Sequence, residues 1–191
     1  MQPLDNERQL IQRAQQKDKD AVAQLYDGYV QAIFRYVRYR VESDYEAEEL
    51  TAEVFVRMVR GLSRYRDDGA PFGAWLYRIA GNLVQDQYRS RKRKLEQLSE
   101  SQVSDETDPF GKTARAEEYA RLHRALKQLP GDYQTVLILR FIEELPYDAV
   151  AKSMNKTEQA ARVLQHRALK ALGAQLGATG IQALLRAGEL T

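Results

Sequence analysis

The side chains best suited to chemistry lie between Phe72 and Lys94, where aromatic residues alternate with polar ones and a basic run follows. Five of the six residues from Arg89 to Lys94 are basic. Cationic side chains neutralise phosphates, and aromatic rings stack on unpaired bases. The pattern favours a surface that holds a nucleic-acid strand, although a basic helix end also complements the helix dipole with no ligand bound.

Read as a helix, this segment has two faces. An apolar stripe at helical spacing, suited to a core, comprises Leu76, Ile79, Ala80 and Leu83. A second, polar stripe lies about a third of a turn away and comprises Trp75, Arg78, Asn82, Asp86 and Arg89. A surface helix needs only the first stripe, so the second is a candidate for base recognition. For Trp75, packing against neighbouring helices remains the alternative.

A second candidate site lies near the C-terminal end of the chain. Short helices are expected at residues 147–153 and 158–172, with Asn155 suited to a left-handed turn and Thr157 to an N-cap between them. This is the outline of a helix-turn-helix, whose second helix enters the major groove of DNA. Residues at its start would contact bases, and Arg167 and Lys170 would lie near phosphates. Short helix pairs also occur in helical proteins that bind no DNA.

The elements that must position these residues are all helical. Apolar stripes predict one helix around Leu10 and another from Val22 to Val37, and no alternating strand pattern occurs. Ser43 and Glu46 form a capping box for a third helix. Its predicted core stripe is Leu50, Val54, Phe55, Met58, Val59 and Leu62.

Two small helical domains follow from this pattern, the second containing the helix-turn-helix. The first spans residues 1–94 and the second 114–173, with a flexible acidic linker at 95–113 and a tail at 174–191. From Glu96 to Asp108 the sequence EQLSESQVSDETD is polar and weakly periodic, as linkers are.

The composition and the histidine spacing argue against thiol, metal and enzymatic chemistry. The chain has 191 residues, 43% of them hydrophobic, with a net charge of +2 and no cysteine. Disulfides and thiol chemistry are therefore excluded. The histidines, His123 and His166, lack metal-ligand spacing, and no phosphate loop or nucleophile motif occurs. We expect no catalytic residue, metal or cofactor. Without a signal peptide or an apolar span, we expect a cytoplasmic protein.

The chain resembles bacterial RNA polymerase sigma factors of the extracytoplasmic-function (ECF) type from about Gln9 to Leu172. The matching stretches, in family order, are DYEAEELTAEVFVRMVRGLSRYR at 44–66, FGAWLYRIAGNLVQDQYRSRKRK at 72–94, ALKQLPGDYQTVLILRFIEELPYDAVAKSM at 125–154 and TEQAARVLQHRALKAL at 157–172. The resemblance implies a factor that binds core polymerase, captures the melted −10 promoter element with its first domain and reads the −35 element as duplex with its second.

Site residues carried over from the family fall into three groups. The polymerase-binding group is Glu49, Leu50, Glu53, Phe55 and Arg57. The −10 group is Arg64, Phe72, Trp75, Arg78, Asn82, Asp86 and Arg89. The −35 group is Thr157, Glu158, Gln159, Arg162, His166, Arg167 and Lys170. The resemblance also implies an anti-sigma partner, which in this family can hold the factor at the membrane.

The recognition helix departs from many relatives. Gln159 stands where they have glycine, and Ala160-Ala161 where they often have Thr-Val. The preferred −35 sequence therefore cannot be carried over. The alternative function is an ordinary helix-turn-helix regulator of duplex operators, but that reading leaves the segment from Phe72 to Lys94 unexplained. An enzyme or a helical interaction module without a DNA role fits less well.

Overall fold

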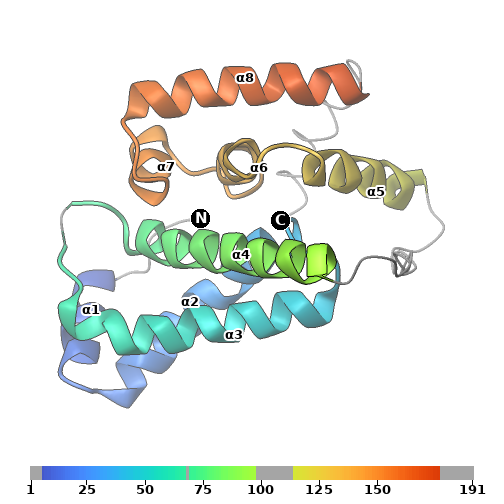
Figure 1. The fold of residues 1–191 in the computed structure, drawn as a ribbon. Helices are drawn as coiled ribbons and strands as arrows, with labels where there is room; N and C mark the ends of the chain where they lie inside the picture. Colours follow the sequence, from blue (N-terminus) through green and yellow to red (C-terminus); the bar gives the residue numbers. More distant parts are fainter. Residues whose placement is uncertain (1–5, 68, 98–113, 177–191) are drawn as a thin grey trace.

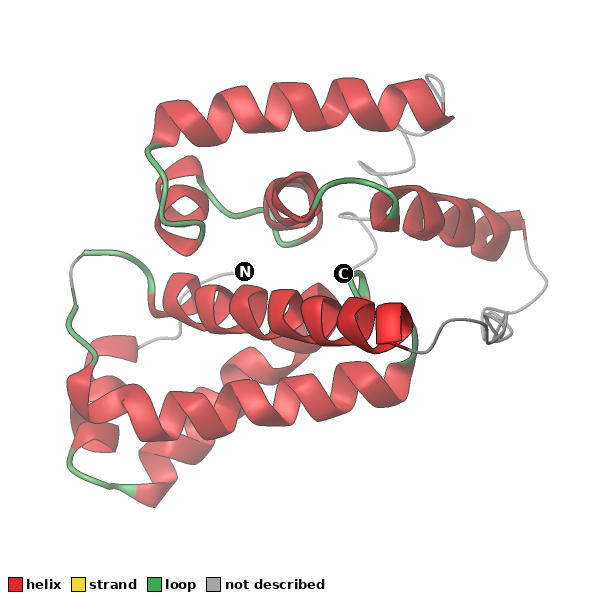
Figure 2. Cartoon of the chain, in the orientation of Figure 1, coloured by secondary structure: helices red, strands yellow, loops and turns green. Residues whose placement is uncertain are grey.

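The computed structural model describes residues 6–67, 69–97 and 114–176. Most of the predicted linker and of the tail lie outside these residues. Within them the regular structure is entirely helical (Figure 2), as expected. The helices are α1 (Glu7–Gln15), α2 (Lys19–Arg38), α3 (Asp44–Gly61), η1 (Leu62–Arg64), α4 (Phe72–Gln97), α5 (Ala114–Lys127), α6 (Gly131–Leu137), η2 (Ile138–Ile142), α7 (Tyr147–Ser153) and α8 (Glu158–Leu176).

We call α1 to α4 the N-terminal unit and α5 to α8 the C-terminal unit. Helix α4 lies between the other helices of its own unit and the C-terminal unit (Figure 1). Helix α8 lies on the far side of the C-terminal unit, away from α4. One continuous cluster of buried side chains runs through both units, so the two are packed against each other.

Helix starts follow the predicted capping chemistry. The Oγ of Ser43 accepts a hydrogen bond from the Glu46 amide at 3.2 Å. The Glu46 carboxylate, however, accepts from the Glu42 amide at 3.1 Å rather than from Ser43 itself. Thr157 caps α8 by accepting from the Ala160 amide at 3.2 Å. Asn155 has φ of 53°, the left-handed conformation predicted for the turn between α7 and α8.

Aromatic side chains fill the core of the N-terminal unit. Tyr29 packs edge-on against Phe72 with ring centroids 5.7 Å apart, and Tyr36 packs in the same way against Tyr77 at 5.3 Å. All four rings are buried. These contacts join α2 to α4, and they fix the rotation of α4 about its axis.

Two sequence predictions of burial or length are wrong. Val59 was expected in the core stripe of α3 but is 53% exposed, because the 100° step per residue carries it off the face that holds Val54 and Met58. Helix α8 continues to Leu176, since Leu172 still packs in the core and no proline stops the helix. Among the described helices, none is both long and apolar enough for a membrane crossing.

Candidate nucleic-acid interface

An aromatic cluster forms at the start of α4. The Trp75 ring lies 4.9 Å from that of Tyr65 and 5.4 Å from that of Phe72, centroid to centroid. Its indole also lies against Gly61, where an added Cβ would come within 3.1 Å of the ring. Phe72 is fully buried, whereas Trp75 is only partly covered. Trp75 is thus both a packing residue and an accessible aromatic surface.

The polar stripe of α4 is partly buried at Arg78 and exposed at Asn82, Asp86 and Arg89. Arg78 is half-buried, and its guanidinium Nε donates to the Lys152 carbonyl oxygen at 3.1 Å. Asn82, one turn further on, lines a cleft against the C-terminal unit. Asp86 and Arg89 are exposed and form a loose ion pair at 3.8 Å. Arg64 is also exposed, at the end of η1.

The residues predicted on α3 do not all share one face. Glu53 and Arg57 form an ion pair at 2.9 Å on the surface, and Glu49 is exposed beside them. Leu50 and Phe55 are 8% and 5% exposed, so their side chains lie beneath the surface and support it from the core.

An apolar patch that sequence reasoning missed lies on the same part of the molecule. It comprises Tyr26, Val56 and Val59, which are 43%, 41% and 53% exposed. Tyr26 packs edge-on against Phe55 with centroids 4.6 Å apart, which ties the α2 member of the patch to α3. Val59 lies at the edge of the buried face of α3, so helical periodicity alone does not decide its exposure.

The helix-turn-helix presents one exposed polar face on α8. This face includes six of the seven predicted −35 residues, Glu158, Gln159, Arg162, His166, Arg167 and Lys170, with Thr157 at the cap. The Arg162 guanidinium lies 3.8 Å above the Tyr147 ring, and Arg140 lies 4.3 Å from the same ring. Tyr147 in turn donates to Gln165 at 2.7 Å. Val163, which the sequence analysis did not single out, is 46% exposed within this face.

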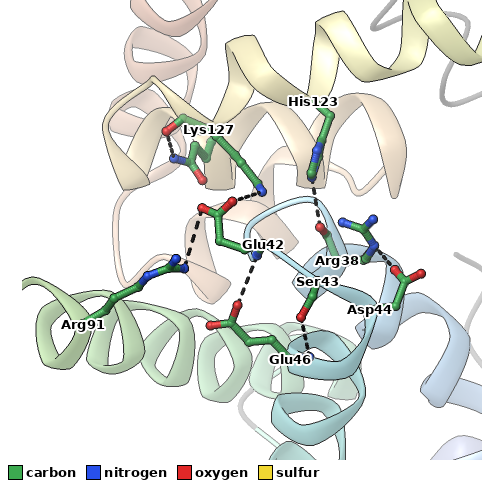
Figure 3. A network of polar contacts seen from close by, with 9 residues as sticks. Arg38, Glu42, Ser43, Asp44, Glu46, Arg91, His123 and Lys127 are labelled. Carbon is green, nitrogen blue, oxygen red and sulfur yellow. Dashed lines mark hydrogen bonds and ion pairs between the residues drawn. The ribbon is translucent and has the colours of Figure 1, made fainter. Parts of the chain in front are cut away.

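One titratable group at the contact between the units is strongly perturbed. Burial lowers the pKa of His123 to about 4, and the nearby Lys127 cation adds to the effect. The His123 Nε2 lies 3.1 Å from the Arg38 carbonyl oxygen, across the boundary between the units (Figure 3). The neutral imidazole therefore donates to that carbonyl at physiological pH.

The similarity of this chain to known proteins identifies its family. The sequence model of sigma-70 region 2 matches residues 25–94, and that of sigma-70 region 4 matches residues 119–172. The ECF RNA polymerase sigma factor SigD of Mycobacterium tuberculosis is 32% identical over 170 residues, covering 85% of this chain and 80% of SigD. The chain belongs to the ECF family of RNA polymerase sigma factors. An ordinary helix-turn-helix regulator would not explain the region 2 match.

Other relatives agree with this assignment. The ECF sigma factor BldN of Streptomyces coelicolor is 36% identical over 169 residues, covering 86% of this chain but only 63% of BldN. The sigma-H factor of Pseudomonas aeruginosa is 30% identical, covering 88% of this chain and 92% of that factor. The region 2 match starts within α2 and ends within α4, and the region 4 match starts within α5 and ends within α8.

Solved structures share the fold. CnrH in complex with the cytosolic domain of CnrY superposes with a TM-score of 0.71 at 24% identity, covering 91% of this chain and 99% of that one. The sigma factor RpoE of Bartonella quintana, in complex with the anti-sigma factor NepR, gives a TM-score of 0.65 at 18% identity, covering 82% of this chain and 96% of that one.

Proposed function

We propose that this chain binds core RNA polymerase and directs it to promoters that carry two elements, a duplex −35 element and a −10 element captured after melting. The observation that carries the proposal is the occurrence, in order, of the region 2 and region 4 sequences in one chain. Each proposed surface is supported by the exposure and the chemistry of its side chains.

The polymerase-binding surface is the exposed side of α3 with its neighbour on α2. Glu49, Glu53 and Arg57 supply charge around the apolar patch of Tyr26, Val56 and Val59. An apolar centre with a charged rim is the usual composition of a protein interface. Leu50 and Phe55 act from beneath by fixing the position of this surface. Of the five positions carried over from the family, Glu49, Glu53 and Arg57 would therefore contact the polymerase directly, whereas Leu50 and Phe55 would not.

The −10 surface comprises the aromatic cluster at the start of α4 and the cations along its polar stripe. An unpaired base loses its stacking partners when the duplex opens, and an accessible aromatic ring offsets that loss. Trp75 and the adjoining Tyr65 offer such a ring, while Arg64, Arg78 and Arg89 would hold phosphates. Asn82 and Asp86 would form hydrogen bonds with base edges, and the buried Phe72 would keep Trp75 in place.

The −35 surface is the exposed face of α8. Its first turn, with Thr157, Glu158 and Gln159, would face the major groove. Arg162 is held by the Tyr147 ring, so it would meet a base or a phosphate with little loss of side-chain freedom. His166, Arg167 and Lys170 continue this face toward the DNA backbone.

None of the three surfaces calls for covalent chemistry, and we propose a binding factor rather than an enzyme. No group of three or more potential metal-ligating side chains occurs in the residues that the structure describes. We also propose a cytoplasmic location and an anti-sigma partner. That partner is suggested by the complex that RpoE of Bartonella quintana, a protein of the same fold, forms with NepR.

The test is run-off transcription from a pool of random promoter-length DNA, using bacterial core polymerase with and without the full chain. We expect new transcripts whose templates share two upstream elements at a fixed spacing. Absence of core binding in a parallel pull-down would overturn the proposal. Core binding without transcripts would leave the polymerase surface supported and reject autonomous promoter selection.

A further inference from the structure

Helix α1 packs beside the segment that joins α3 to α4. It contacts α2 and η1 (Figure 1), and it buries Leu10, Ile11 and Ala14 in the core. The match to sigma-70 region 2 starts at residue 25 and so does not include α1. The segment beside α1 carries Arg64 and Tyr65 of the proposed −10 surface. Helix α1 is therefore placed to act on that surface from outside the matched sequence.

Gln15, the last residue of α1, binds the backbone of this segment. Its side-chain Nε2 donates to the Leu62 carbonyl oxygen at 3.1 Å and to the Tyr65 carbonyl oxygen at 2.9 Å. The Leu62 oxygen also accepts from the Tyr65 amide at 3.1 Å, which closes the η1 turn. A side-chain amide carries two N–H donors, so Gln15 alone binds the backbone at both ends of that turn.

Tyr65 connects this backbone to the aromatic cluster of α4. Its ring centroid lies 4.9 Å from that of Trp75 and 5.1 Å from that of Phe72. The carbonyl group of Tyr65 is thus held by α1, while its ring packs on α4. The position of the Tyr65 ring against Trp75 therefore depends on the hydrogen bond from Gln15.

Glu7, in the first turn of α1, binds the other end of the segment. Its carboxylate accepts from the Tyr29 hydroxyl and, at 3.5 Å, from the amide of Phe72, the first residue of α4. Burial and the Glu7 carboxylate raise the pKa of Tyr29, so its hydroxyl stays a donor. Helix α1 thus contacts the backbone at Tyr65 and at Phe72, the two ends of the segment between η1 and α4.

The local structure of the chain fixes Tyr65 only weakly. η1 is a three-residue 3₁₀ helix, and such turns have poorer hydrogen-bond geometry than an α-helix. Tyr65 follows it with an extended backbone, at φ −61° and ψ 132°. A ring that is in place before its ligand arrives loses less freedom on binding than a mobile ring. Hydrogen bonds from a neighbouring helix can supply that fixed position.

We propose that Gln15 is a positioning residue for capture of the −10 element. Its two hydrogen bonds fix Tyr65 and, through Tyr65, the Trp75 ring on which an unpaired base would stack. Gln15 acts through these residues and does not itself contact the base. The role rests on the proposed function of the −10 surface, whereas the effect of Gln15 on Trp75 can be measured without DNA.

Four variants of the full chain test this role. Gln15→Leu removes both donors, and Gln15→Glu keeps the size of the side chain but replaces its donor by an acceptor. Gln15→Lys keeps a donor and is the conservative variant that should restore function. Gln12→Leu is the matched control, because Gln12 is exposed one turn earlier on α1. Thermal melting followed by circular dichroism identifies the variants that fold.

The surroundings of Trp75 are measured first, without DNA or polymerase. Trp75 is the one tryptophan of the chain, so the intrinsic fluorescence reports on this residue. We expect acrylamide to quench it more efficiently in Gln15→Leu and Gln15→Glu than in the parent, because Tyr65 no longer stays against the indole. Gln15→Lys and Gln12→Leu should match the parent.

Base capture is measured with the holoenzyme by fluorescence anisotropy. The probes are labelled single-stranded oligonucleotides that carry either the −10 sequence recovered by run-off transcription or a scrambled sequence. Gln15→Leu and Gln15→Glu should bind the −10 strand about fivefold to tenfold less tightly, a part of the contribution of one stacked base. Their binding to the scrambled strand and to core polymerase should be unchanged, which separates positioning from a general loss of folded protein.

Unchanged quenching, or an unchanged preference for the −10 strand, in the folded Gln15→Leu or Gln15→Glu variant would overturn the positioning role. Equal losses in Gln12→Leu would also overturn it, since the effect would then belong to α1 as a whole. Failure of the proposed function is distinguishable, because the parent holoenzyme itself would show no preference for the −10 strand. The positioning role would then fall together with the proposed function.

Discussion

At the scale of single residues, Trp75 has two roles that mutation can separate. It packs on Tyr65, Phe72 and Gly61, and it offers an accessible ring to an unpaired base. We predict that Trp75→Ala lowers the free energy of unfolding by about 2 kcal/mol, less than for a fully buried tryptophan. It should also reduce transcription from duplex promoters more than from templates already melted at the −10 element.

The control for this prediction is Trp75→Phe, which keeps an aromatic ring against Tyr65 and Phe72. It should retain most stability and an intermediate rate of promoter opening. The rates of promoter opening by Trp75→Ala and by Trp75→Phe can be measured with the promoter recovered in the run-off experiment. Equal defects of Trp75→Ala on duplex and melted templates would show that Trp75 serves only as a packing residue.

His123 makes the contact between the two units sensitive to acid. Its pKa is about 4 in the folded protein and about 6.5 when the side chain is solvated. Between these values the unfolded or opened chain binds more protons, so stability is full above about pH 6.5 and falls as the pH drops toward 4. We predict a loss of about 2 kcal/mol over this window, discounting the shift because His123 is partly exposed.

This prediction is checked by urea unfolding at several pH values and by NMR titration of the imidazole. His123→Gln keeps a donor for the Arg38 carbonyl, and it should flatten the stability curve between about pH 4 and 6.5. A His123 titration near 6.5 in the parent protein would contradict the observed burial.

Residue chemistry was readable from the sequence where it is local. The left-handed Asn155 and the caps at Ser43 and Thr157 follow from side-chain chemistry within three or four residues. The ion pair between Arg35 and the buried Glu143 was not predictable, because the two residues are 108 positions apart. Nothing in the local pattern of either helix marks a charged residue that will be buried by the other unit.

At the scale of helices, α3 and α8 each carry an exposed valine within a charged surface, and this allows a paired experiment. We predict that Val59→Asp weakens binding to core polymerase about tenfold or more, because a charge would be desolvated at the centre of the interface. Val163→Asp should leave core binding unchanged and reduce binding to duplex containing the −35 element. Both sites are exposed, so neither variant should lose appreciable stability.

The measurements are titrations of labelled protein with core polymerase and, separately, with the selected promoter duplex. Loss of core binding by both variants would indicate a general effect of added negative charge. The experiment also addresses what sequence periodicity misses. A stripe such as Leu50, Val54 and Met58 identifies the buried face of α3 correctly, but residues at its edge, such as Val59, are assigned only when the neighbouring helices are in place.

At the scale of the whole molecule, the two proposed DNA surfaces are not equivalent in the free chain. Arg78 of α4 bonds to the C-terminal unit at Lys152. Helix α8 lies on the far side of that unit (Figure 1), and its Arg162, Arg167 and Lys170 side chains are exposed. Packing of one unit on the other therefore engages Arg78 of the −10 surface but leaves Arg64, Asp86 and Arg89 and the −35 surface exposed. This asymmetry could not be derived from the sequence, since the polar linker allows both packed and separated units.

We therefore predict that disrupting the contact between the units leaves the affinity of the free chain for duplex DNA unchanged. The free parent protein and Glu143→Gln should bind a short −35 duplex equally and weakly, and their affinities should fall with the same slope as salt is raised, because the same α8 cations contact the phosphates. Fluorescence anisotropy at several salt concentrations measures both quantities. A gain in duplex affinity in Glu143→Gln would mean that the contact between the units also masks α8.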